Sequence, residues 1–182
     1  MRIAITGGIA EGKSTVLGYC QALGLSCESA DVLAKDVFVS PIVKEFLTSE
    51  FGHLPERREV LIRVGMDHDF RRKLNRRMHP EILRALQRSN AQVLEVPLLI
   101  ESCLQGQFSK VWVVTCGPDE QMRRLVDREG DAQAARHLIA SQLPTRAKVP
   151  FADRVIRTDC PEDTVKSVVR EELRLSFPAL VH

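Results

Sequence analysis

A glycine-rich segment that contains one lysine lies near the start of the chain, in the stretch TGGIAEGKST at residues 6–15. Gly7, four further residues and then Gly12-Lys13-Ser14 fit the phosphate-binding pattern G-x-x-x-x-G-K-[ST]. The segment follows an apolar run and precedes a helical pattern, so its backbone N–H groups and the helix N-terminus can converge on an anion. The alternative is a glycine-rich turn with an exposed lysine. We expect a nucleoside triphosphate to contact Gly8, Ile9, Ala10, Glu11, Gly12, Lys13, Ser14 and Thr15.

Two side chains of this segment suit phosphate chemistry. Lys13 would reach the β and γ phosphates, and the Ser14 hydroxyl would hold Mg²⁺. Glu95 ends a second apolar run, VLEV, and an acid in this position commonly holds the metal's water shell. Its alternative reading is an acid at a strand end with partial solvent access. Glu11 fits less well, because a carboxylate beside bound phosphates is unfavourable unless its side chain points outward.

Asp31 is the candidate for activating a phosphate acceptor. It follows the run LSCES at residues 25–29, and parallel strands bring their carboxyl ends to one edge of the sheet, where such folds bind ligands. An aspartate near the γ-phosphate can orient a hydroxyl and accept its proton. The alternative is that Asp31 only caps the helix that follows it.

Cations elsewhere in the chain could neutralise a transferring phosphate. Arg124 and Arg128 are four residues apart on one expected helix face, and Lys148 follows the next helix; each could also be an ordinary solvated charge. A basic run at residues 71–77 precedes His79 and Pro80; we interpret it as a surface helix, with binding of a substrate's phosphates as the alternative. We expect Pro80 at the first position of a helix, with His79 either as its cap or as a ligand.

The chain alternates β-rich runs with helical patterns, which is typical of a parallel α/β sheet. We expect about five strands, at residues 2–6, 25–29, 92–96, 110–115 and 153–157. Helices are expected at about 13–24, 31–50, 56–90 in pieces, 118–143 in two pieces broken near Gly130, and 161–174. The long helical block is more than one crossover needs, so it predicts an inserted substrate lobe at about residues 31–90. Residues 1–182 are otherwise expected to form a single domain.

Composition sets limits on the partners. The 182 residues carry 26 Lys and Arg against 24 Asp and Glu, a net charge of +2, so the charge balance does not indicate nucleic acid or an anionic membrane as the main partner. Five scattered cysteines without a C-x-x-C pair argue against a disulfide framework or a cysteine zinc site. We expect a soluble cytoplasmic protein without a membrane span.

Five motifs together resemble the dephospho-CoA kinase family. They are TGGIAEGKST, SAD at 29–31, MHP at 78–80, EVPLLIES at 95–102, and SQLPTRAK at 141–148 followed by FAD. The resemblance implies a P-loop kinase fold with a helical CoA lobe and a lid at about 118–150. It also implies transfer of the γ-phosphate of ATP, with Mg²⁺, to the ribose 3′-hydroxyl of dephospho-CoA, in the last step of coenzyme A biosynthesis. We expect a monomer or weak homo-oligomer.

The resemblance also implies roles for individual residues. Asp31 matches the family's proposed base, while Lys13 and Ser14 match its nucleotide and metal contacts, with Glu95 as a second metal contact. Arg128 and Lys148 match catalytic cations on the lid side. The residues that match substrate contacts are Asp31, His79, Pro97, Leu98, Glu101 and Arg124.

This chain departs from the family pattern at several positions. Ala10 and Glu11 replace Gly and Ser, Ser29 replaces an acid, Glu95 replaces an aspartate, and Glu129 stands where aspartate is usual. Two alternatives therefore stay open: a nucleoside or nucleoside monophosphate kinase, and a nucleotide-binding homologue without catalysis. The chain lacks the Asn-Lys-x-Asp guanine signature, which argues against a GTPase switch.

Overall fold

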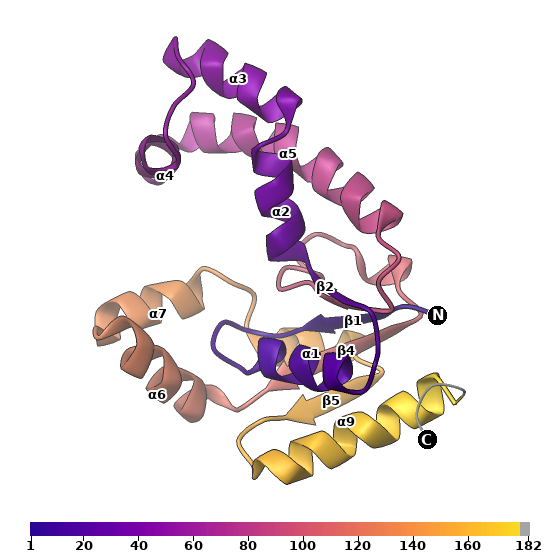
Figure 1. Ribbon diagram of the computed structural model, residues 1–182. Coiled ribbons are helices and arrows are strands. Elements are labelled where there is room, and N and C mark those ends of the chain that lie inside the picture. The colour runs from indigo at the N-terminus through magenta and orange to yellow at the C-terminus, as the bar shows by residue number, and fades with distance from the viewer. Residues whose placement is uncertain (179–182) are drawn as a thin grey trace. The chain divides into compact units, whose positions relative to one another are not determined.

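A five-stranded parallel sheet forms the centre of one compact unit in the computed structural model, which describes residues 1–178 (Figure 1). The strands stand in the order β2-β3-β1-β4-β5. Their bounds are β1 (Ile3–Thr6), β2 (Cys27–Ser29), β3 (Val93–Glu95), β4 (Lys110–Thr115) and β5 (Arg154–Arg157). The expected parallel sheet is therefore confirmed, including the strands expected at residues 25–29 and 153–157.

The register of the sheet aligns the ends of neighbouring strands. Ser29 of β2 pairs with Glu95 of β3, which in turn pairs with Ile5 of β1. All pairings are parallel, so the loops that leave β1, β2 and β3 leave from the same edge of the sheet. Ligands bind at this edge in open α/β sheets.

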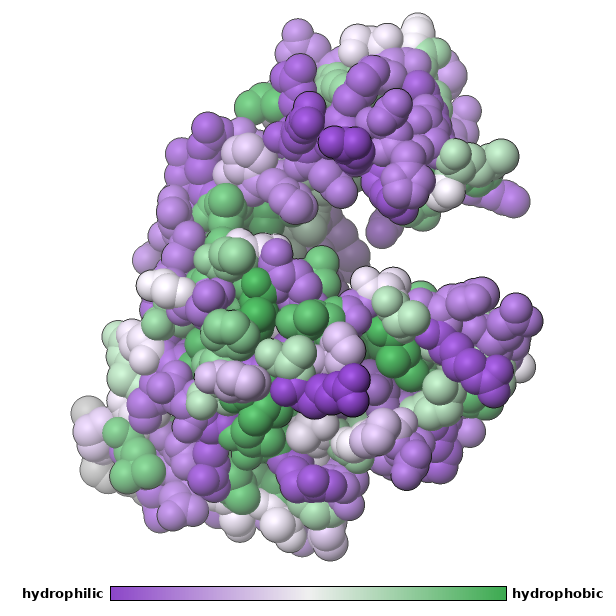
Figure 2. Space-filling view, turned by 180° about the vertical axis from the view of Figure 1, so that it is seen from behind, coloured by the Kyte–Doolittle hydropathy of each residue, from purple (hydrophilic) through white to green (hydrophobic). Residues whose placement is uncertain are grey.

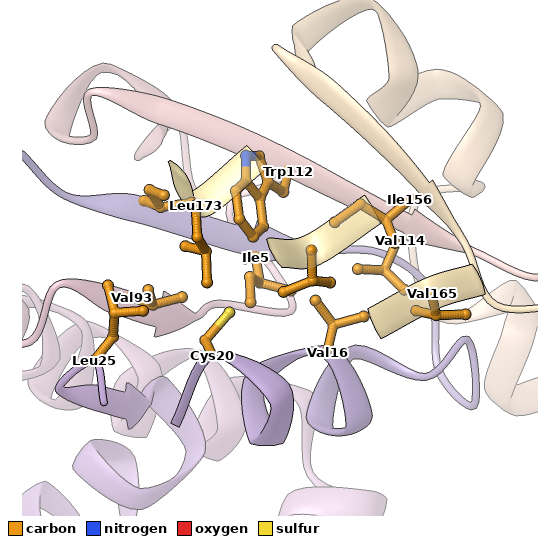
Figure 3. Packing of buried hydrophobic residues seen from close by; sticks show 12 residues of the cluster. Ile5, Val16, Cys20, Leu25, Val93, Trp112, Val114, Ile156, Val165 and Leu173 are labelled. Carbon is orange, nitrogen blue, oxygen red and sulfur yellow. The ribbon is translucent and has the colours of Figure 1, made fainter. Parts of the chain in front are cut away.

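The three central strands, β1, β3 and β4, are buried because helices cover the sheet. The helices and 3₁₀ turns of this unit are α1 (Lys13–Ala22), η1 (Gln105–Gln107), α6 (Pro118–Glu129), α7 (Ala132–Ala140), α8 (Thr145–Lys148), η2 (Val149–Phe151) and α9 (Glu162–Ser176). Val16 and Cys20 of α1 pack with Leu173 of α9 against Ile5 and Trp112 of the sheet (Figure 3). The sheet is thus a rigid platform for the loops at its edge.

The second compact unit, residues 30–89, is entirely helical. It contains α2 (Ala30–Phe38), α3 (Pro41–Phe51), α4 (Arg57–Met66) and α5 (His68–Arg88). Its core is its own: the Phe70 ring, 1% exposed, stacks on Phe46 at 6.0 Å and meets Phe51 edge-on at 5.6 Å. The guanidinium of Arg63 lies 4.3 Å from the centre of the Phe70 ring. Hydrophilic residues cover most of its visible surface in Figure 2.

One expected helix boundary is wrong. Pro80 lies inside α5 and does not begin a helix, so His79 is an exposed residue in the middle of that helix and not its cap. Pro80 has no N–H to donate to the carbonyl of Arg76, and the helix nevertheless continues. Packing of α5 against α2, α3 and α4 offsets this lost hydrogen bond. Among the residues described, no helix is both long and apolar enough to span a bilayer.

Candidate active site

The loop between β1 and α1 adopts a conformation that depends on glycine. A Cβ at Gly7 would lie 2.2 Å from the carbonyl oxygen of Val114, so no side chain fits there. Gly12 precedes α1 with φ +89°, and its missing Cβ leaves room for Thr158, whose Oγ1 would lie 3.0 Å away. Ala10 also has a positive φ, +60°, which is a costly backbone conformation for a residue with a Cβ.

The structure brings Lys13, Ser14 and Glu95 to this loop. The Lys13 side chain is almost buried, and its Nζ donates to the carbonyl oxygen of Gly8 at 2.7 Å, so the loop wraps around the ammonium group. The Ser14 hydroxyl lies 3.4 Å from both carboxylate oxygens of Glu95, which is 7% exposed. Glu95 is therefore buried, and the alternative of a solvated strand-end acid does not hold. Oxygen donors of this kind are those that Mg²⁺ prefers.

Glu11 points into the protein, against the expectation that its side chain would have to point outward. It is 2% exposed, and Oε1 accepts a hydrogen bond from the Thr115 hydroxyl at 3.0 Å. Oε2 accepts hydrogen bonds from the backbone N–H of Gly8 and from the Thr145 hydroxyl. These three donors satisfy the buried carboxylate, which explains how it is held inside the protein, while its negative charge still lies beside the loop.

Residues that the sequence did not single out hold the same loop. Gln121 of α6 donates to the carbonyl oxygen of Ile9 at 2.9 Å, and the Gln142 side chain accepts from the Ile9 N–H at 3.1 Å. Thr158 donates to the carbonyl oxygen of Glu11 at 2.8 Å. Gln142 lies within the motif SQLPTRAK, so a signal existed for it, whereas nothing local marks Gln121. A cavity of about 390 Å³ adjoins this network.

Arg124 and Arg128, the two arginines of α6 that the sequence singled out, have different environments. Arg124 donates from Nε to Glu120 at 2.8 Å and from its terminal nitrogens to the side chain and carbonyl of Thr158. Hydrogen bonds from Arg123 and Arg124 lower the pKa of Glu120 to about 2, so it stays a carboxylate that orients Arg124. Arg128 is more exposed and pairs with Glu129 at 2.8 Å.

Lys148 is fully buried, which its sequence context did not predict. Its Nζ donates to the carbonyl oxygen of Pro97 at 2.9 Å and pairs with Oε1 of Glu101 at 2.8 Å. The same Glu101 oxygen accepts from the N–H of Leu143 at 3.1 Å. Lys148, Pro97 and Glu101 thus lie together and join the loop after β3 to α8, while Leu98 is exposed beside them.

Asp31 and His79 belong to the helical unit. The helix α2 begins at Ala30, so Asp31 lies in its first turn and is not its cap residue. Asp31 borders a cavity of about 700 Å³ within this unit. The other lining residues are mostly cationic or apolar: Ala34, Lys35, Phe38, Val39, Lys44, Leu47, Leu54, Pro55, Arg57, Leu61 and Met78. His79 neighbours Met78 in the sequence, but it is not part of that lining.

Comparison with known proteins places the chain in a family. A family model for dephospho-CoA kinase matches residues 1–162. The chain belongs to the dephospho-CoA kinase family. A dephospho-CoA kinase from Shouchella clausii is 33% identical over 188 residues, covering 92% of this chain and 95% of the relative.

Solved structures agree with this family at the level of the fold. The crystal structure of TT1252 from Thermus thermophilus has a TM-score of 0.82 at 26% identity, with 97% of each chain covered. A dephospho-CoA kinase from Campylobacter jejuni has a TM-score of 0.64 at 19% identity, covering 96% of each chain. The chain is therefore a P-loop kinase of the dephospho-CoA kinase family, and a nucleotide is its phosphate donor.

Proposed function

We propose that the protein transfers the γ-phosphate of ATP to the ribose 3′-hydroxyl of dephospho-CoA, giving coenzyme A and ADP. Family membership is the observation that carries this proposal. The phosphate loop supports it, because Lys13 is held inside a loop whose glycines leave no room for side chains. That arrangement is typical of a site for a triphosphate.

The loop residues have separate parts in this reaction. Lys13 would exchange its contact with the Gly8 carbonyl for the β and γ phosphates and neutralise their charge. Ser14 and Glu95 fit Mg²⁺, because the Ser14 hydroxyl lies 3.4 Å from the oxygens of the buried Glu95 carboxylate. When bound, that ion would add positive charge beside the phosphates. Residues 1–178 contain no cluster of three His, Cys, Asp or Glu side chains that could hold a metal ion, so Ser14 and the phosphates would have to complete the site.

The cavity of the helical unit suits the acceptor. It is large enough for part of a nucleotide with a long flexible arm, and it combines three cations with apolar side chains such as Phe38 and Leu54. The cations Lys35, Lys44 and Arg57 would bind the acceptor's phosphates. Asp31 at its border would accept the proton of the ribose 3′-hydroxyl while that oxygen bonds to the γ-phosphorus and ADP leaves.

An acceptor screen tests this function. Purified protein with ATP and Mg²⁺ is given dephospho-CoA, adenosine or nucleoside monophosphates, and release of ADP is measured. We expect turnover with dephospho-CoA and a gain of one phosphate on its 3′ position. Turnover only with nucleosides or their monophosphates would contradict dephospho-CoA as the acceptor. Nucleotide binding without any turnover would contradict kinase activity.

The Asp31→Asn variant tests the base. We expect kcat to fall by about 100-fold or more, because the amide cannot accept the proton, while the Kd for ATP stays within about threefold. Asp36→Asn, an exposed aspartate on the same helix, is the matched control and should retain activity. Equal losses of kcat and ATP affinity in Asp31→Asn would contradict the role of a base.

A further inference from the structure

We infer that Glu11 is a positioning residue, whose buried carboxylate fastens the phosphate loop to Thr115 and Thr145 and so holds the loop in the shape that binds the nucleotide. The inference rests on the proposed function, because it concerns how that reaction's phosphate donor is bound. The phosphate-loop pattern leaves the position of Glu11 unspecified, so this role does not follow from the motif.

The contacts of Glu11 join segments that are far apart in the sequence. Thr115 ends β4, Thr145 begins α8, and both hydroxyls donate to the Glu11 carboxylate. Each hydroxyl has one proton to donate and also accepts a backbone N–H: Thr115 from Gly117 at 3.2 Å and Thr145 from Gly8 at 3.0 Å. Glu11 therefore stands between the sheet edge and the segment that carries Gln142 and Lys148.

The two side-chain oxygens of Glu11 are the acceptors of this network. Three donors converge on the two oxygens of Glu11: the N–H of Gly8 and two hydroxyl groups. A carboxylate accepts all of them, and an amide oxygen in the place of Oε2 would still accept from Gly8 and Thr145. Hydrogen bonds to a charged acceptor in a buried place are stronger than those between neutral groups. The network is therefore a rigid connection between three segments.

The negative charge of Glu11 does not itself favour nucleotide binding. A negative charge below a loop that binds phosphates repels them, so by electrostatics alone Glu11 weakens binding. A favourable role must come from geometry, through the order that Glu11 imposes on Gly8 and the neighbouring backbone. Charge and geometry act in opposite directions, and two substitutions can separate them.

Calorimetry of ATP binding, without an acceptor, measures whether the ordering of the loop by Glu11 outweighs the repulsion from its charge. Glu11→Gln removes the charge but keeps the length and one acceptor oxygen, and we expect its Kd within about threefold of the unchanged protein. Glu11→Ser removes the connection, and we expect a Kd about tenfold higher. In turnover assays the KM for ATP should rise in Glu11→Ser, while the KM for the acceptor stays constant.

Two further variants test whether Glu11 and Thr145 act through the same connection. Thr145→Val deletes one donor and should weaken ATP binding in the same direction by less, and the double variant Glu11→Ser, Thr145→Val should lose less than the sum of the two. Amide hydrogen exchange of residues 142–148 should be faster in each variant. Glu171→Gln and Thr164→Val, exposed on α9, are the matched controls.

The outcomes separate this inference from the proposed function. Equal or tighter ATP binding by Glu11→Ser would overturn the positioning role, because charge would then outweigh geometry. Additive effects of the Glu11 and Thr145 substitutions would also overturn it. If the unchanged protein binds no ATP, the proposed function itself fails.

Discussion

The sheet unit and the helical unit present their candidate sites in different ways. In the sheet unit, side chains from other segments hold the backbone of one glycine-rich loop. In the helical unit, side chains of packed helices line a cavity with cations and apolar groups. A backbone site tolerates few residue types and leaves a recognisable pattern, whereas a side-chain cavity can be built from many sequences.

Lys13→Met should have the largest effect and should act on the sheet unit alone. We expect kcat/KM to fall by about 1,000-fold, because the charge that neutralises the transferring phosphate is removed. Initial rates of ADP formation measure it, with Lys166→Met, an exposed lysine on α9, as the control. A retained rate would show that the phosphate loop is not where the phosphate is transferred.

Phe70→Ala should test whether the helical unit depends on its own core. We expect the free energy of unfolding of that unit to fall by about 3–4 kcal/mol, because a ring that stacks on Phe46 and lies under Arg63 is lost. Urea unfolding followed by circular dichroism measures it, and exposed Ile62→Ala on α4 is the control. If ATP affinity falls together with this stability, the two units do not unfold separately.

Lys148→Met should show how much a buried ion pair of the sheet unit contributes to stability compared with an ion pair on its surface. We expect a loss of about 3 kcal/mol in the free energy of unfolding, since the change leaves the Glu101 carboxylate without its buried cation. Adding Glu101→Gln should restore part of that loss. The exposed pair Lys166–Glu162 is the control, where Lys166→Met should cost less than about 1 kcal/mol. A fall in kcat with unchanged stability would instead support the catalytic role expected from the sequence.

Ala10→Gly should have the smallest effect. Glycine adopts the positive φ of this position without a steric penalty, and we expect a net gain of about 0.5 kcal/mol, because greater freedom in the unfolded chain offsets part of the relief. Thermal unfolding measures it. Ala134→Gly inside α7 is the matched control and should be destabilised, since its φ is already helical. Destabilisation of Ala10→Gly would contradict the strain at this position.

The sequence predicted the sheet and the phosphate loop well, because alternating strands and helices and the glycine spacing are local patterns. It could not predict that Glu11 turns inward, since Thr115 and Thr145, which make this possible, are more than 100 residues away in the chain. The burial of Lys148 against Glu101 depends in the same way on distant segments. Pro80 was misplaced because a local rule for helix starts was overruled by the packing of a long helix.

The core of the sheet unit has one more consequence. The chain has a single tryptophan, Trp112, which is fully buried in β4, and a single tyrosine, Tyr19, in α1. The helical unit contains neither, so its only aromatic rings besides histidine are phenylalanines. Fluorescence excited at the indole absorption band therefore reports on the sheet unit alone, and the unfolding of that unit can be followed without an engineered label.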